Sequence, residues 1–128
     1  MRKRVLIVDD EKDITESLKV GLERQGFEVE TYNDPAGALS VYKAGAYDSI
    51  ILDIRMPGMN GFELFRELRK KDKKTNIIFL TAFEMYREEF RKLFPDMAVQ
   101  GFLQKPISIA LLVAQIKRPD DGTRNEID

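Results

Sequence analysis

Three acidic residues, a threonine and a lysine each stand at or just after the end of a short apolar run. They are Asp9, Asp10, Asp53, Thr81 and Lys105. Carboxylates held close together repel one another, and each resists ionising without a counter-charge. A hard divalent cation removes that conflict, and Mg²⁺ suits a site with few carboxylates and several retained waters. One carboxylate could then act as a nucleophile toward a phosphoryl group, so the set predicts metal-assisted phosphoryl transfer to an aspartate.

The remaining residues of the set have roles in the same chemistry. The cation would neutralise charge on the phosphoryl oxygens, and Lys105 would hold a further oxygen as a point charge. The hydroxyl of Thr81 could hydrogen-bond a third oxygen, and the small Ala82 beside it leaves room for the phosphoryl group to enter. Each residue alone has a plainer explanation, such as a helix N-cap or a solvated loop lysine. All of those explanations would have to hold together, so we favour the chemical interpretation.

The elements that position these residues follow from five short strand-like runs that alternate with helical patterns. The runs cover residues 4–8, 28–32, 49–52, 77–80 and 99–103. The first, third and fourth are almost wholly apolar, as in central parallel strands, and the second alternates as in an edge strand. Short connections predict right-handed crossovers and a flavodoxin-like, doubly wound, five-stranded parallel sheet in the order 2-1-3-4-5. Ligands bind beyond the carboxyl ends of such strands, where the chemical residues should meet.

The helical segments have recognisable faces and ends. Apolar stripes are formed by Ile14, Leu18 and Leu22, by Phe62, Phe65 and Leu68, and by Tyr86, Phe90, Leu93 and Phe94. Gly26 and Pro95 are stop signals for the first and last of these. Asp34-Pro35 predicts an N-cap and first helical position, with the helix closing at Gly45. We interpret the basic residues within 69–74 as a solvated helix end.

Bulk composition restricts the function further. The 128 residues are 43% hydrophobic and 34% charged with a net charge of −1, which suits one soluble domain and does not suggest a nucleic-acid binder. Neither cysteine nor histidine is present, so disulfides, zinc sites and Ser-His-Asp chemistry within the chain are excluded. No apolar run approaches the ~20 residues that cross a bilayer, and we expect a cytoplasmic protein without membrane contact.

Four motifs together resemble the response-regulator receiver domains of two-component signalling, over roughly residues 4–116. They are Val5-Leu6-Ile7-Val8-Asp9-Asp10-Glu11, the run from Asp48 to Asp53 continuing to Met56-Pro57-Gly58-Met59-Asn60-Gly61, Thr81-Ala82, and Lys105-Pro106. The resemblance implies that Asp53 is the phosphoacceptor. It also implies that Asp10 binds Mg²⁺ directly, Asp9 binds it directly or through water, and the backbone carbonyl of Arg55 completes the protein ligands.

The resemblance also implies a switch and its partners. Thr81 would be the switch hydroxyl, Phe102 the aromatic switch residue, and Lys105–Pro106 a cis peptide bond. Residues 1–118 would form the receiver domain and 119–128 a disordered polar tail. The chain would assist its own phosphorylation and dephosphorylation without being an enzyme. Its phosphodonor would be a sensor histidine kinase or phosphotransfer protein, and its output an unknown protein, with no direct nucleic-acid contact.

Residues 108–116 are apolar nearly all round the expected fifth helix. We predict an interaction surface there, made of Ile109, Leu112, Val113 and Ile116, for a partner or for a homodimer through the fourth helix, fifth strand and fifth helix. The alternative is that the tail or a neighbouring helix covers this face.

Three other functions are alternatives to a phosphorylated receiver. A receiver that acts without phosphorylation, as a dimerisation or scaffolding module, stays open. An aspartate-nucleophile phosphatase would need a second aspartate two residues after the first, where Arg55 stands. A flavodoxin-like cofactor binder would need a phosphate-cradling loop after the first strand, where Asp9-Asp10-Glu11 would repel phosphate.

Overall fold

A computed structural model describes residues 2–82, 85–97 and 101–117, and for Met85 and Tyr86 it describes the backbone alone. The predicted residues Val99 and Gln100 and the tail at 119–128 lie outside these ranges. Five parallel strands form one sheet in the order β2-β1-β3-β4-β5, which confirms the predicted flavodoxin-like topology. The strands are β1 (Arg4–Val8), β2 (Glu28–Tyr32), β3 (Ser49–Asp53), β4 (Asn76–Thr81) and β5 (Gly101–Gln104).

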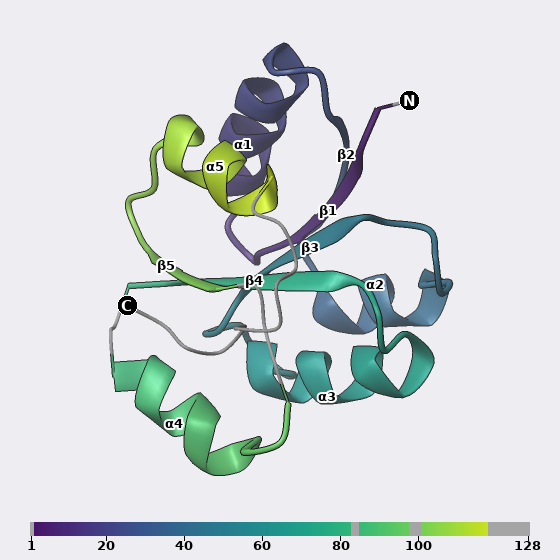
Figure 1. Cartoon of the computed structure of the whole chain (residues 1–128), viewed down its shortest axis with the longest axis vertical. Helices are drawn as coiled ribbons and strands as arrows, with labels where there is room; N and C mark the ends of the chain where they lie inside the picture. Colours follow the sequence, from purple (N-terminus) through teal and green to yellow (C-terminus); the bar gives the residue numbers. More distant parts are fainter. Residues whose placement is uncertain (1, 83–84, 98–100, 118–128) are drawn as a thin grey trace.

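Helices cover both faces of this sheet, with α1 and α5 on one side and α2, α3 and α4 on the other (Figure 1). The helices are α1 (Lys12–Arg24), α2 (Pro35–Val41), α3 (Gly61–Lys71), α4 (Met85–Leu93) and α5 (Ile109–Lys117). None of the described helices is long and apolar enough to cross a bilayer.

The sheet separates two apolar clusters. On the α2–α3–α4 side the strands contribute residues such as Leu6 and Phe79, and on the α1–α5 side residues such as Ile7 and Ile78. Strands β1, β3 and β4 are therefore buried on both faces, as their nearly continuous apolar sequences require. Strand β2 lies at the edge, and its first three residues alternate between exposed and buried as predicted.

Most predicted helix ends are confirmed, but α2 ends at Val41 rather than at Gly45. The Asp34 side chain accepts a hydrogen bond from the backbone of Gly37 at 2.9 Å, as expected of an N-cap. Beyond Val41, the Tyr42 hydroxyl donates to the Asp72 carboxylate at 2.7 Å and the Gly45 backbone donates to it at 3.1 Å. These tertiary hydrogen bonds hold the chain in an extended and then turned path that a helix would not allow.

Two side chains lie differently from their predicted positions. Arg69 was placed in the solvated basic end of α3, but it is buried, and its guanidinium donates to the backbone carbonyl of Thr75 at 2.8 Å. Leu93 was placed in the apolar stripe of α4, but it is 48% exposed, while Phe90 and Phe94 of the same stripe are buried. The helix therefore packs through a narrower face than its sequence suggests.

The predicted interaction surface on α5 requires a correction. Leu112 and Ile116 are 0% and 1% exposed, and Ile109 and Val113 pack against the same core cluster as α1. Helix α5 lies beside α1 so closely that a Cβ added to Gly21 would collide with the Ile109 side chain. The apolar character of these four residues is thus explained by their packing within the domain, which is the alternative of a covering neighbouring helix.

Candidate functional site

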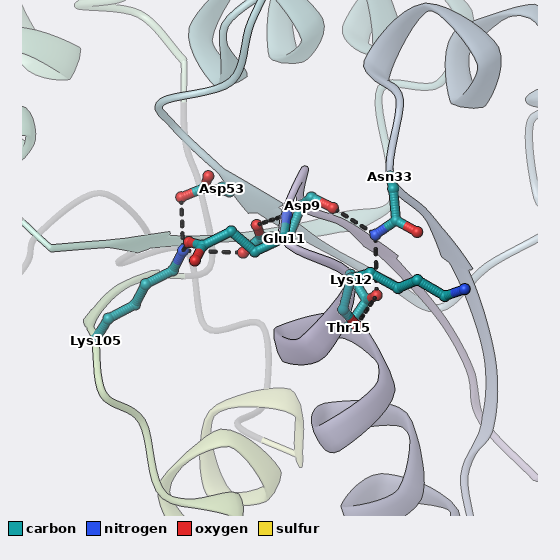
Figure 2. A network of polar contacts seen from close by, with 7 residues as sticks. All are labelled: Asp9, Glu11, Lys12, Thr15, Asn33, Asp53 and Lys105. Carbon is teal, nitrogen blue, oxygen red and sulfur yellow. Dashed lines mark hydrogen bonds and ion pairs between the residues drawn. The ribbon is translucent and has the colours of Figure 1, made fainter.

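The residues singled out by their chemistry lie at the carboxyl ends of four strands. Asp9 directly follows β1, Asp53 ends β3, Thr81 ends β4 and Lys105 directly follows β5. Because parallel strands present the same end at one edge of the sheet, these positions converge as predicted. Lys105 extends from the loop after β5 toward the acidic residues (Figure 2).

Lys105 joins the two buried carboxylates of the site. Its Nζ lies 2.9 Å from Asp9 Oδ2 and 3.0 Å from Asp53 Oδ1, with Glu11 Oε1 further away at 3.6 Å. Asp9 is 0% and Asp53 is 5% exposed, so neither carboxylate is well solvated. The Lys105 ammonium therefore stabilises the negative charge of these carboxylates, a role that water plays for exposed carboxylates.

Burial and neighbouring charge perturb the titration of this pair. Burial, reinforced by the charge of Asp9, raises the pKa of Asp53 to about 6, although Lys105 works in the opposite direction. Burial also disfavours the Lys105 ammonium, but hydrogen bonds to Asp9 and Asp53 outweigh it and raise the pKa of that group. The structure thus holds one protonated lysine between two carboxylates, one of which ionises less readily than an ordinary aspartate.

Asp9, Asp10 and Asp53 form a group of potential metal ligands. One carboxylate oxygen from each lies within 4.8 Å of the others. Oxygens around an octahedral Mg²⁺ at about 2.1 Å are roughly 3 to 4 Å apart, so only a small contraction would be needed. The donors are hard oxygens, and a cationic group, the Lys105 ammonium, already occupies this acidic centre. The residues present fit a divalent cation of the Mg²⁺ type. Arg55, whose carbonyl was predicted as a further ligand, is exposed on the loop after β3.

The loop between β3 and α3 is fixed by Gly61, a residue of the second motif whose role the sequence pattern does not reveal. A Cβ on Gly61 would collide with the main-chain oxygen of Asp53 and would lie 2.8 Å from Ile54 Cα. The Gly61 backbone also donates to the Ile54 carbonyl at 2.8 Å. Only glycine allows the start of α3 to lie this close to the Asp53 backbone.

Asn33 and Thr15 belong to the polar network of the site and were not singled out from the sequence. The Asn33 amide donates to the main-chain oxygen of Asp9 at 2.8 Å and to Thr15 Oγ1 at 3.0 Å. A signal was available, because Asn33 directly follows β2 and so stands at the same edge of the sheet.

The predicted switch residues lie on the neighbouring strands β4 and β5, where Phe102 pairs with Phe79 and Thr81 with Gln104. Thr81 is buried, and its main-chain oxygen accepts a hydrogen bond from the Lys105 backbone at 2.8 Å. Phe102 is 7% exposed, with its ring centroid 5.1 Å from that of Phe79. The Lys105–Pro106 peptide bond is cis, as predicted. Ala82 is exposed.

Comparisons with known proteins agree with this arrangement. Residues 5–117 match the family described as "Response regulator receiver domain". The "Uncharacterized transcriptional regulatory protein YkoG" of Bacillus subtilis is 33% identical over 124 residues, covering 95% of this chain and 54% of the relative. The "Transcriptional regulatory protein PcoR" of Escherichia coli is 30% identical over 90% of this chain and 50% of its own length. The chain thus spans about half the length of these relatives.

Solved structures show the same likeness. The response regulator protein TrrA from Thermotoga maritima, in complex with Mg²⁺-BeF, is 39% identical with a TM-score of 0.74, covering 90% of this chain and 96% of that one. The non-phosphorylated HemR receiver domain from Leptospira biflexa is 31% identical with a TM-score of 0.77, covering 92% of this chain and 98% of that one.

Proposed function

This chain belongs to the response regulator receiver domain family, and from that premise we propose that it is a phosphorylation switch in which Asp53 accepts the phosphoryl group. The observation that carries the proposal is the position of Asp53. It is a buried carboxylate at the carboxyl end of a central strand, next to two further carboxylates and 3.0 Å from the Lys105 ammonium. A purely structural or scaffolding domain has no need of such a costly concentration of charge, so the phosphorylation-independent alternative is not favoured.

Asp9, Asp10, Asp53 and the main-chain carbonyl of Arg55 would hold Mg²⁺ in this proposal. The bound cation would neutralise the charge that gathers on the phosphoryl oxygens during transfer. Lys105 now forms ion pairs with Asp9 and Asp53, and it would turn to a phosphoryl oxygen once the donor is bound.

The transfer step requires a free carboxylate oxygen on Asp53. At neutral pH a group with a pKa of about 6 is largely ionised, so Asp53 is available as a nucleophile. Its Oδ attacks the phosphorus of the donor, an Oδ–P bond forms, and the bond from phosphorus to the leaving group breaks. With a phosphohistidine on a sensor kinase or phosphotransfer protein as donor, the imidazole nitrogen leaves with the bonding electron pair. Water then attacks the phosphorus, the Oδ–P bond breaks, and the free carboxylate and inorganic phosphate are released, so the chain turns itself off and acts on no other substrate.

The output would follow from a population shift. Thr81 would hydrogen-bond a phosphoryl oxygen, and Phe102, which lies on the neighbouring strand, would repack beside it. The surface of α4, β5 and α5 would change, and an output protein or a second copy of the chain would recognise it. We propose that the phosphorylation and dephosphorylation of Asp53 take place in the cytoplasm.

Intact mass spectrometry tests the proposal. The protein is incubated with acetyl phosphate, with and without Mg²⁺, beside an Asp53→Asn variant. One added phosphoryl group that requires the metal and is lost in the variant is the expected result. A folded wild-type protein that gains no mass, from acetyl phosphate or from a panel of phosphorylated histidine kinases, would overturn it.

A further inference from the structure

The turn between β1 and α1 concentrates negative charge and has no side-chain cap on the helix that follows it. Asp9, Asp10 and Glu11 follow one another there, and α1 begins at Lys12. Glu11 occupies the N-cap position, but its side chain makes no capping hydrogen bond. Such a bond from a side chain to the first turn normally fixes the junction between a loop and a helix. Within the turn the Glu11 backbone donates to the Asp9 carboxylate at 2.9 Å, and the missing cap leaves a side-chain link between the turn and α1 to another group.

Asn33, which directly follows the neighbouring strand β2, provides this link. Its Nδ2 donates to the main-chain oxygen of Asp9 at 2.8 Å and to Thr15 Oγ1 at 3.0 Å (Figure 2). The Thr15 hydroxyl in turn donates to the main-chain oxygen of Lys12 at 3.0 Å, and Thr15 is 1% exposed. One amide thereby joins Asp9, the first residue of the acidic turn, to the first turn of α1.

The peptide geometry links this tie to the predicted metal ligands. The Asp9 carbonyl and the Asp10 nitrogen belong to one rigid plane, so a donor held against that carbonyl restricts the rotation of the plane. The plane sets the direction in which the Asp10 side chain leaves the backbone. Asp10 is exposed, so packing does little to orient it. The Asp9 carboxylate, in contrast, is held directly by the Glu11 backbone at 2.9 Å and by Lys105.

We propose that Asn33, supported by Thr15, is a positioning residue for the Mg²⁺ site: it holds the acidic turn so that Asp10 points toward Asp9 and Asp53. The inference rests on the proposed function, because it assigns a role in the same metal site. Groups that orient metal ligands commonly contribute a factor of about ten or more to metal affinity.

The test measures Mg²⁺ binding without any phosphodonor. Amide chemical shifts of the complete chain are followed during titration with MgCl₂, which gives a Kd and shows whether each variant is folded. Asn33→Ala should bind Mg²⁺ about tenfold more weakly than the wild type. Thr15→Val, which removes only the hydroxyl, should weaken binding about fivefold, and Thr15→Ser should restore it. Asn76→Ala is the matched control. Asn76 begins β4 and so lies at the amino-terminal end of the strands, away from the acidic site, and its replacement should leave the Kd unchanged.

Urea unfolding in EDTA separates positioning from a purely structural role. The inference would be refuted by a variant that is less stable in EDTA yet has the wild-type Kd for Mg²⁺, measured at a urea concentration at which both proteins are folded. Such a result would leave the proposed function intact. Should Asn33→Ala fail to fold, equal Kd values for Thr15→Val and Thr15→Ser would refute it instead. A wild-type protein that does not bind Mg²⁺ would overturn the proposed function, and the inference with it.

Discussion

Replacing the proposed phosphoacceptor should stabilise the metal-free protein. Burial raises the pKa of Asp53 from 3.8 to about 6, with the neighbouring Asp9 adding to the effect, so the native state disfavours the ionised carboxylate. That change in pKa corresponds to about 3 kcal/mol of native-state free energy at neutral pH. Asp53→Asn keeps the size and one acceptor oxygen but carries no charge. We expect it to raise the free energy of unfolding by about 2 to 3 kcal/mol and the melting temperature by about 8 °C.

The pH dependence identifies the cause. A carboxyl group whose pKa is raised in the folded state lowers stability fully above pH 6 and not at all below 3.8. The advantage of Asp53→Asn should therefore be complete at pH 7.5 and shrink as the pH falls toward about 4. Urea unfolding in EDTA, followed by circular dichroism at several pH values, measures it. The exposed Asp10, as Asp10→Asn, is the matched control and should change stability much less. An Asp53→Asn protein that is no more stable than the wild type at pH 7.5, or an advantage independent of pH, would refute the reasoning.

Three further predictions follow from the same geometry. Lys105→Met leaves Asp9 and Asp53 buried without their ammonium, so it should lower the free energy of unfolding in EDTA by about 3 kcal/mol, as measured by urea unfolding. Added Mg²⁺ should recover much of this stability, and a loss that Mg²⁺ does not reduce would contradict the prediction. Gly61→Ala places a Cβ against the main-chain oxygen of Asp53 and should cost about 2 kcal/mol in urea unfolding while slowing phosphorylation, and an unchanged rate would show that the loop is not fixed in this way. Burial disfavours the ionised Asp72 carboxylate, but hydrogen bonds outweigh burial and hold its pKa below 3.8, so the carboxylate stabilises the fold above that pH. Asp72→Asn should therefore lower the free energy of unfolding by about 2 kcal/mol at pH 7. The difference from the wild type should fade as the pH drops below 3.8, and a difference that is independent of pH would contradict the prediction.

The arrangement of the sheet was predictable because it depends on local patterns. Wholly apolar runs such as Val5–Val8 can only be buried on both faces, and the alternation in Glu28–Tyr32 suits an edge. Strand order and handedness then follow from short crossovers. The position of Asp9, Asp53 and Lys105 at one edge of the sheet was thereby determined before any contact was known, since each stands at or next to the carboxyl end of its strand.

The partners of individual side chains could not be predicted in this way. The apolar residues Leu112 and Ile116 suggested a contact surface, yet they pack within the domain because α5 lies beside α1. The basic residue Arg69 suggested a solvated helix end, yet its guanidinium is buried and bonded to the Thr75 carbonyl. Sequence patterns show which residue types can be buried, but not which neighbouring element will cover them.

The sequence by itself determined the fold, the chemical identity of the site and the residues that supply its charge. Only the tertiary structure decided how that charge is held: Lys105 between Asp9 and Asp53, Gly61 against the Asp53 backbone, and Asn33 on the carbonyl of Asp9. The physical reason is one of range. Hydrophobic periodicity is a property of neighbours in the chain, whereas hydrogen bonds and ion pairs depend on positions set by every element between residues as far apart as Asp9 and Lys105.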